Sequence, residues 1–212
     1  MNKKVWLVLG GILALLLGLL GYFLLDNSKN NISKDNDNTI ENNNSLDNDL
    51  NKDIDTSKTV VIYFSATGTT KRVASSLSSK LGSDLVEIVP KEKYSASDLD
   101  YNNLGSRVSK EHEDTTSRPE IENKIDLDKY DTVYLGYPIW WSDAPRIIYS
   151  FLDNYDLSKK NLYLFSTSAS SGISTSVNNI KNYQKDLNIL GNRRFGSSFK
   201  DSEIEEFIKN NK

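Results

Sequence analysis

The chain has 212 residues, of which 37% are hydrophobic and 26% charged, and its formal net charge is −3. That length fits one ordinary globular domain with appendages and excludes a large multidomain enzyme. With no cysteine and a single histidine, the chain lacks the residues for disulfides, thiolate nucleophiles, iron–sulfur clusters, cysteine zinc sites or a histidine-rich metal centre. The slight acidity argues against a nucleic-acid partner. Redox or group-transfer chemistry would need a borrowed cofactor.

The first segment, residues 1–25, contains an uncharged apolar run from residue 5 to residue 25. At 1.5 Å per residue such a run crosses a bilayer core of about 30 Å, so the sequence predicts a single-pass membrane anchor. A cleaved secretory signal is the alternative, but the run ends Tyr22-Phe23-Leu24-Leu25-Asp26 without a small-residue cleavage site. Lys3 and Lys4 precede the run, which predicts a cytoplasmic amino terminus and an extracytoplasmic remainder.

Residues 26–57 form a second segment that is dominated by asparagine and aspartate, with only isolated aliphatic residues. Such a composition buries too little apolar surface to offset the entropy of the chain, so we expect a disordered linker. The remaining residues, 58–212, have the size of a common single domain and carry the predicted fold.

In the third segment, short apolar runs alternate with helical patterns. The runs typical of strands are residues 59–64, 85–89, 132–136 and 161–165, with a weaker fifth at 187–195. The helical patterns are residues 70–81, one within 97–110, 145–152, 173–187 and 203–210. This alternation predicts an α/β domain built on a doubly wound, five-stranded parallel sheet with helices on both faces.

Ligands of doubly wound sheets bind beyond the carboxyl ends of the strands, so the loops there are the candidate site. The loop after the first strand is hydroxyl-rich and consists of Ser65, Ala66, Thr67, Gly68, Thr69 and Thr70. It leads into a predicted helix, whose free N–H groups favour a phosphate. The loop matches neither glycine pattern of nucleotide triphosphate or dinucleotide sites. An ordinary capped helix start is the alternative interpretation.

The loop after the third strand contains Pro138, Ile139, Trp140, Trp141 and Ser142. Two adjacent tryptophans leaving a strand cannot both point into one core, so one of them is expected to present a flat face for stacking on an aromatic ring. The alternative is that both rings pack on neighbouring helices.

The loop after the fourth strand is made of small residues, namely Thr167, Ser168, Ala169, Ser170, Ser171 and Gly172. Small residues let a flat ligand approach the backbone closely. The three loops together predict one elongated pocket for a flat aromatic monophosphate. His112 lies in a charged segment, and we expect it to be a solvated surface residue without a catalytic role.

Four motifs stand in order at these positions: YFSATGTTKRVA at 63–74, RPEI at 118–121, LGYPIWWSDAPR at 135–146 and FSTSASSGIS at 165–174. Through them the chain resembles the flavodoxin family, in particular the bacterial flavodoxin-like proteins with a YPIWW loop, over residues 58–212. The resemblance implies non-covalent FMN, with its phosphate at residues 65–70 and its ring against residues 138–141 and 167–172. Ser142 stands where related sequences commonly have glycine, and a peptide flip there costs more for serine.

The function that this resemblance implies is electron transfer. We expect a membrane-anchored FMN electron carrier that exchanges electrons with a membrane donor or with redox partner proteins outside the membrane. The alternatives are an FMN-dependent reductase of quinones or other small molecules that uses a nicotinamide donor, and a surface-displayed binding module without a cofactor.

Overall fold

The computed structural model of the chain describes residues 56–211. The predicted membrane span at residues 5–25 lies outside this part, as does the predicted linker up to residue 55. Within residues 56–211, no helix is both long and apolar enough to cross a bilayer.

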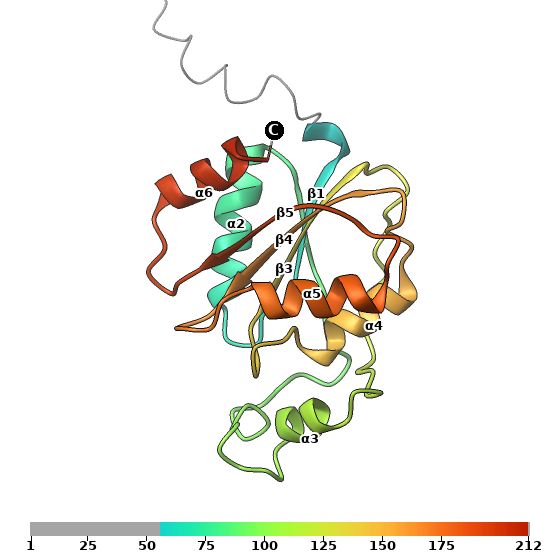
Figure 1. Cartoon of the computed structure of the whole chain (residues 1–212), viewed down its shortest axis with the longest axis vertical. Helices are drawn as coiled ribbons and strands as arrows, with labels where there is room; N and C mark the ends of the chain where they lie inside the picture. Colours follow the sequence, from blue (N-terminus) through green and yellow to red (C-terminus); the bar gives the residue numbers. More distant parts are fainter. Residues whose placement is uncertain (1–55, 212) are drawn as a thin grey trace, which may run out of the picture. The chain divides into compact units, whose positions relative to one another are not determined.

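Five parallel strands form one sheet in the order β2-β1-β3-β4-β5 (Figure 1). The strands are β1 (Thr59–Tyr63), β2 (Asp84–Glu87), β3 (Thr132–Pro138), β4 (Asn161–Thr167) and β5 (Asn188–Phe195). The helices are η1 (Thr56–Lys58), α2 (Thr69–Leu81), α3 (Arg107–Glu113), α4 (Arg146–Asn154), α5 (Ser174–Tyr183) and α6 (Asp201–Lys209). The predicted five-stranded parallel α/β sheet is confirmed.

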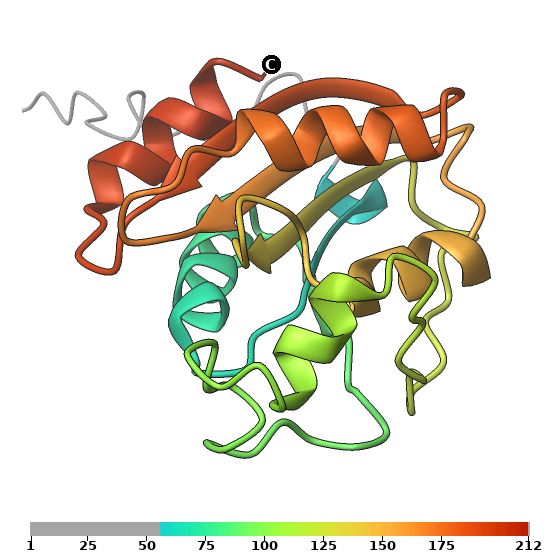
Figure 2. The same ribbon diagram turned by 60° about the horizontal axis from the view of Figure 1, so that its bottom comes forward.

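Helices cover both faces of the sheet, because each central strand is apolar on both sides. Along β1, Val60 and Ile62 join the core beneath α4 and α5, whereas Val61 and Tyr63 join the core beneath α2 and α6. This alternation follows from the two-residue period of a strand. Figure 2 shows α5 lying across one face of the sheet, with α2 on the other.

The second strand was predicted to be buried, and this prediction is wrong. Strand β2 is an edge strand that begins at Asp84, and its residues are exposed or half-buried. Tyr130 and Lys129 hold this edge through Asp84, with donor–acceptor distances of 2.5 and 2.8 Å. A short apolar run next to a polar edge has the same sequence pattern as a buried strand, which explains the error.

The second helix was predicted within residues 97–110, and this prediction is wrong in its bounds. Turns occupy residues 96–99, 101–102 and 104–105, and α3 begins at Arg107. Ser106 sets the start, because its side chain accepts a hydrogen bond from the amide of Ser109 at 3.3 Å. The segment from residue 88 to residue 131 is therefore a long excursion between β2 and β3 that carries only this short helix. Figure 1 places α3 beyond the ends of the strands.

The other edge of the sheet is β5, which pairs only with β4 and has a register shift opposite Leu162 and Tyr163. Its cations are held by neighbouring elements. Arg193 lies 2.9 Å from a carboxylate oxygen of Glu206 on α6, and Arg194 donates to the carbonyl of Ser168 at 2.9 Å.

Candidate functional site

The strand order places a switch point between β1 and β3, where the connections leave toward opposite faces of the sheet. Open α/β sheets bind their ligands at such a crevice, outside the carboxyl ends of the strands. A cavity of about 490 Å³ lies there. Its size is within the range of about 300–1,000 Å³ found for small-molecule sites.

The loop between β1 and α2 forms one end of the cavity. Gly68 is the residue before α2 and has φ of +88°, a left-handed conformation that favours glycine. Its amide donates to the hydroxyl of Ser65 at 3.1 Å, which closes the loop on itself. Among its polar side chains, Thr67 is exposed and Thr69 half-buried. The loop thus combines free hydroxyls with the positive end of a helix, which suits an anion.

A buried hydrogen bond joins two loops that are 97 residues apart in sequence. The hydroxyls of Thr70, in the first turn of α2, and Thr167, at the end of β4, lie 2.8 Å apart. Both residues are almost fully buried. Both residues were predicted to contact the cofactor, and in the structure their hydroxyls are hydrogen-bonded to each other. This bond fixes the hydroxyl-rich loop against the small-residue loop.

The two adjacent tryptophans take different roles, as predicted. Trp140 is half-buried and packs edge-on against Phe64 and Tyr94, with ring centroids 5.8 and 5.4 Å away. Trp141 is 39% exposed. One tryptophan therefore anchors the loop in the core, and the other remains available at the cavity.

A tight turn presents Trp141. The amides of Trp140 and Asp143 each donate to the carbonyl of the other residue at 2.9 Å, which leaves Trp141 and Ser142 as a two-residue loop. Both have positive φ, 48° and 66°. A two-residue loop of this kind needs left-handed backbone at both central positions, and a side chain there costs about 1–2 kcal/mol per residue.

Replacing Ser142 with glycine is expected to raise the free energy of unfolding by about 0.5–1 kcal/mol, because glycine relieves the left-handed strain but loses more backbone entropy on folding. Urea denaturation measures the change. Ser170→Gly is the matched control, since Ser170 is exposed and its φ is not positive. An equal loss of stability in both variants would mean that position 142 carries no strain in solution.

The third wall comes from the loop after β4. Ser168, Ala169, Ser170 and Ser171 line the cavity, and the hydroxyl of Ser168 donates to the carbonyl of Ser171. Gly172 is exposed and lies outside the lining. The bond within the loop keeps its small side chains at the cavity.

Sequence reasoning missed a fourth wall. Leu99, Tyr101 and Val108, all from the excursion between β2 and β3, line the cavity opposite the sheet. Tyr101 also meets the ring of Trp141 edge-on at 6.3 Å. The sequence signal that could have indicated this wall is the presence of isolated apolar residues in an otherwise polar segment.

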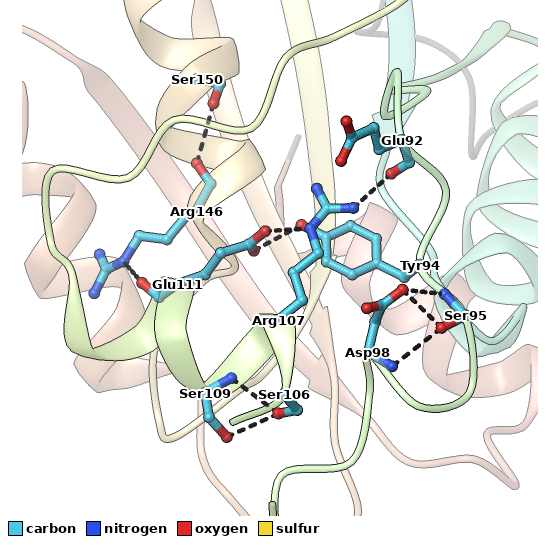
Figure 3. A network of polar contacts seen from close by, with 10 residues as sticks. All are labelled: Glu92, Tyr94, Ser95, Asp98, Ser106, Arg107, Ser109, Glu111, Arg146 and Ser150. Carbon is cyan, nitrogen blue, oxygen red and sulfur yellow. Dashed lines mark hydrogen bonds and ion pairs between the residues drawn. The ribbon is translucent and has the colours of Figure 1, made fainter. Parts of the chain in front are cut away.

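A buried carboxylate holds this fourth wall in place (Figure 3). Glu111 on α3 is 7% exposed and accepts hydrogen bonds from the Tyr94 hydroxyl at 2.7 Å and from Nε of Arg107 at 2.6 Å. The Arg107 guanidinium lies 4.0 Å from the centre of the Tyr94 ring. Burial raises the pKa of the Tyr94 hydroxyl, and the Glu111 carboxylate raises it further, so the hydroxyl remains a donor. Since Tyr94 packs on Trp140, the network reaches the cavity wall.

A second anchor lies behind the turn. The Asp143 carboxylate accepts from the Tyr149 hydroxyl at 2.9 Å and from the Ala144 amide at 2.8 Å. Burial, together with Asp143, raises the pKa of the Tyr149 hydroxyl above its ordinary value. Asp143 therefore binds to the body of the domain and helps to hold the turn.

His112 was predicted to be solvated, and this prediction is wrong. The residue lies on α3, is half-buried and stacks its ring on that of Trp141, with centroids 4.6 Å apart and planes 8° from parallel. The charged residues around it gave a surface pattern, whereas the stack depends on a contact with a residue 29 positions further along the chain.

The cavity brings together most of the predicted site residues, namely Ser65, Ala66, Thr67, Thr70, Pro138, Ile139, Trp140, Trp141, Ser168, Ala169 and Ser170. The others do not line it: Gly68, Thr69, Ser142, Thr167 and Gly172. Of these, Gly68 and Thr69 start α2, Ser142 shapes the turn and Thr167 bonds to Thr70. Their assignment to a cofactor remains a prediction.

A larger groove, of about 680 Å³, lies elsewhere, between α4, α5 and the excursion. Arg118 crosses it and donates to Asp153 at 2.7 Å and to the Tyr183 hydroxyl at 2.8 Å. Arg118 of the RPEI motif therefore holds the excursion to the two helices. Because the groove is away from the strand ends, the smaller cavity is the better candidate site.

Comparisons with known proteins agree with this geometry. The flavodoxin family model matches residues 58–211. A candidate flavoprotein from Bacteroides eggerthii is 40% identical, covers 73% of this chain and 97% of its own, and superposes with a TM-score of 0.70. A similar protein from Bacteroides uniformis is 39% identical over 72% of this chain and 97% of its own, with a TM-score of 0.69.

A flavoprotein from Lactobacillus acidophilus, solved in complex with FMN, is 26% identical over 71% of this chain and 98% of its own, with a TM-score of 0.57. No curated protein matches the chain. The solved relatives consist almost entirely of the matched domain, so a domain of this kind folds on its own. Over residues 58–211, the chain belongs to the flavodoxin family.

Proposed function

We propose that this domain binds FMN non-covalently and carries electrons between redox partners. The observation that carries the proposal is the cavity at the switch point, which extends from the hydroxyl-rich loop at the start of α2 to the wall containing Trp141. The FMN complex of the Lactobacillus acidophilus relative supports the choice of cofactor.

The residues present fit FMN at both ends. At the loop before α2, a Cβ built on Gly68 would meet no atom within 4 Å, so the backbone of this loop is uncovered beside Gly68. Thr67 and Ser65 line the cavity there and can donate hydrogen bonds to phosphate oxygens. At the other end, Trp141 offers an aromatic face, and Ile139 and Ala169 offer apolar contacts.

When bound, FMN would supply the electron transfer through its ring system. The chain holds and orients it, and the walls from Trp141, Leu99 and Val108 exclude water from one side of the cavity. A protein shifts the reduction potential of a flavin by binding its redox states unequally, and a tenfold difference in affinity corresponds to about 59 mV for one electron.

The proposal includes a location. The uncharged run at residues 5–25 supports a single membrane span, and the preceding lysines support a cytoplasmic amino terminus with the domain outside. A tether would raise the local concentration of the domain near a membrane donor or a redox partner protein. Protease added to intact cells tests this location: cleavage of the domain supports it, and protection that is lost only on lysis contradicts it.

The test of cofactor binding is an absorption spectrum of residues 58–212 after incubation with FMN and desalting. We expect retained flavin absorbance in the wild-type protein and a loss of affinity of about tenfold to a hundredfold in Trp141→Ala, because stacking and apolar burial are lost. Leu190→Ala is the matched control, since Leu190 is an exposed residue of β5 outside the cavity lining.

The outcomes separate the candidate functions. Loss of all flavin on desalting contradicts the proposal and favours a binding module without a cofactor. Retained flavin with steady-state oxidation of NADH or NADPH favours a reductase over a carrier.

A further inference from the structure

The single histidine of the chain stands directly behind the aromatic wall of the cavity. Its imidazole is nearly parallel to the Trp141 indole, with ring centroids 4.6 Å apart. Trp141 lines the cavity, and His112 does not. His112 instead lines a small space of about 10 Å³ behind the wall, together with Ala144 and Pro145. The indole therefore lies between the cavity and the imidazole.

One arginine fixes both partners of this stack. Arg146, at the start of α4, is 8% exposed. It donates from Nε to the carbonyl of Glu111 at 3.0 Å and from a terminal nitrogen to the carbonyl of His112 at 3.3 Å, as Figure 3 shows for the first of these bonds. Its other terminal nitrogen lies 3.7 Å from Asp143, which closes the turn that carries Trp141. The helix and the turn are thus held to the same side chain.

Charged residues from three elements lie next to His112 or to its contacts. Glu111 on α3 and Arg146 on α4 line the same small space as His112, and Arg146 lies 3.7 Å from Asp143 in the β3–α4 connection. Glu113 and Asp114 follow His112 in sequence. The carboxylate of Glu111 is paired with Arg107, and that of Asp143 is paired with Tyr149 and Arg146. Within this set, the histidine is the residue type that changes its charge between pH 5 and 8.

We propose that His112 is a positioning residue for Trp141 and that its protonation makes the reduction of bound FMN easier. This rests on the proposed FMN binding. A protonated imidazole over an indole is held by the electrons of the ring face, so the stack tightens when His112 takes up a proton. Its positive charge then lies behind the wall and favours the more negative, reduced cofactor.

The coupling is reciprocal, as binding linkage requires. If a redox partner protein reduced the bound cofactor, His112 would take up a proton at a ring nitrogen, where an N–H bond forms as an O–H bond of a solvent hydronium ion breaks. Through this coupling, the reduction potential gains a dependence on pH that comes from the protein, in addition to the dependence of the flavin itself.

The first experiment uses the domain, residues 58–212, without FMN. Because the chain has one histidine, its imidazole proton resonances need no assignment. Protons over an indole face shift upfield, so we expect upfield imidazole resonances in the wild-type protein and ordinary positions in Trp141→Leu. Ordinary positions in both proteins would overturn the proposal, whatever the outcome of the FMN binding test.

The second experiment measures the reduction potential of the FMN-loaded domain at pH 5.5 and pH 8.5. For each protein, the preference for reduced over oxidised FMN at pH 5.5 is divided by the preference at pH 8.5. We expect this quotient to be about fivefold larger in the wild-type protein than in His112→Phe. The phenylalanine keeps an aromatic ring on Trp141 but carries no proton, so the variant should retain FMN affinity. His112→Gln removes the aromatic ring from Trp141, so this variant should bind FMN more weakly than the wild-type protein and His112→Phe.

Each result bears on a different part of the argument. Equal pH dependence in the wild-type protein and His112→Phe overturns the electrostatic role of the imidazole. Equal FMN affinity in all three proteins overturns its positioning role. A domain that retains no FMN contradicts the proposed function itself, and the stack remains measurable by the resonances of the apo protein.

Discussion

Replacing Gly136 with alanine is expected to lower the free energy of unfolding by about 3 kcal/mol, at the upper end of the usual cost of overpacking a core. Gly136 lies in β3 directly opposite Phe165 of β4. A Cβ built on it would lie 2.1 Å from Cζ of the Phe165 ring, which is fully buried. Because the ring cannot move toward solvent, either the strands must separate or the ring must leave its rotamer. Urea denaturation gives the free energy through the midpoint and slope.

Gly172→Ala is the matched control for this prediction. Gly172 is exposed, and a Cβ on it would meet no atom within 4 Å. Removing the clash by a second change gives a further check: adding Phe165→Leu to Gly136→Ala should cost less than the sum of the two single changes, because the two positions are in contact. Additive effects, or a Gly136→Ala midpoint equal to that of the wild-type protein, would contradict the packing described here.

Neutralising Glu111 is also expected to lower the stability of the domain. Glu111→Gln is expected to lower the free energy of unfolding by about 1.5–3 kcal/mol, because the bonds from Arg107 and Tyr94 lose their charged acceptor. The side chain of Glu111 is 9% exposed and that of Arg107 is 21% exposed, so solvent screens the pair only partly. Urea denaturation measures the loss, and Glu113→Gln, at an exposed neighbouring position, should change stability by less than about 0.5 kcal/mol.

The same variant should loosen one part of the domain more than the rest. Glu111 ties α3 to Tyr94, so its neutralisation should speed hydrogen exchange of the α3 amides and leave those of β3 unchanged. Uniformly faster exchange throughout the domain would show that the network supports the whole core and not only the fourth wall of the cavity.

The sheet was predictable because its signals are local. The residues of β1 and β3 are apolar on both faces, which is typical of central parallel strands, and each is followed by a loop of unusual composition. The carboxyl ends of neighbouring strands meet at one edge, so Ser65, Trp141 and Ser168 could be expected to lie together before any distance was known.

The fourth wall was not predictable in this way. Leu99, Tyr101 and Val108 lie within residues 97–110, where the sequence predicts a helix and not a cavity wall. Their place at the cavity depends on Glu111 and Arg118, which hold the excursion by contacts with other segments. For the same reason α3 was expected in the wrong place: the helical pattern of residues 97–110 is interrupted by turns, and the cap at Ser106 decides the start.

The edge strand β5 has a consequence for how copies of the domain behave beside one another. An uncovered edge presents unpaired backbone groups to which a strand of another molecule can add. Here Arg193 and Arg194 follow one another on that strand, held by Glu206 and by the carbonyl of Ser168, and the pairing with β4 has a register shift. Charged side chains and an irregular register on an edge strand disfavour the addition of a further strand, so this edge is protected against self-association even where the protein is crowded.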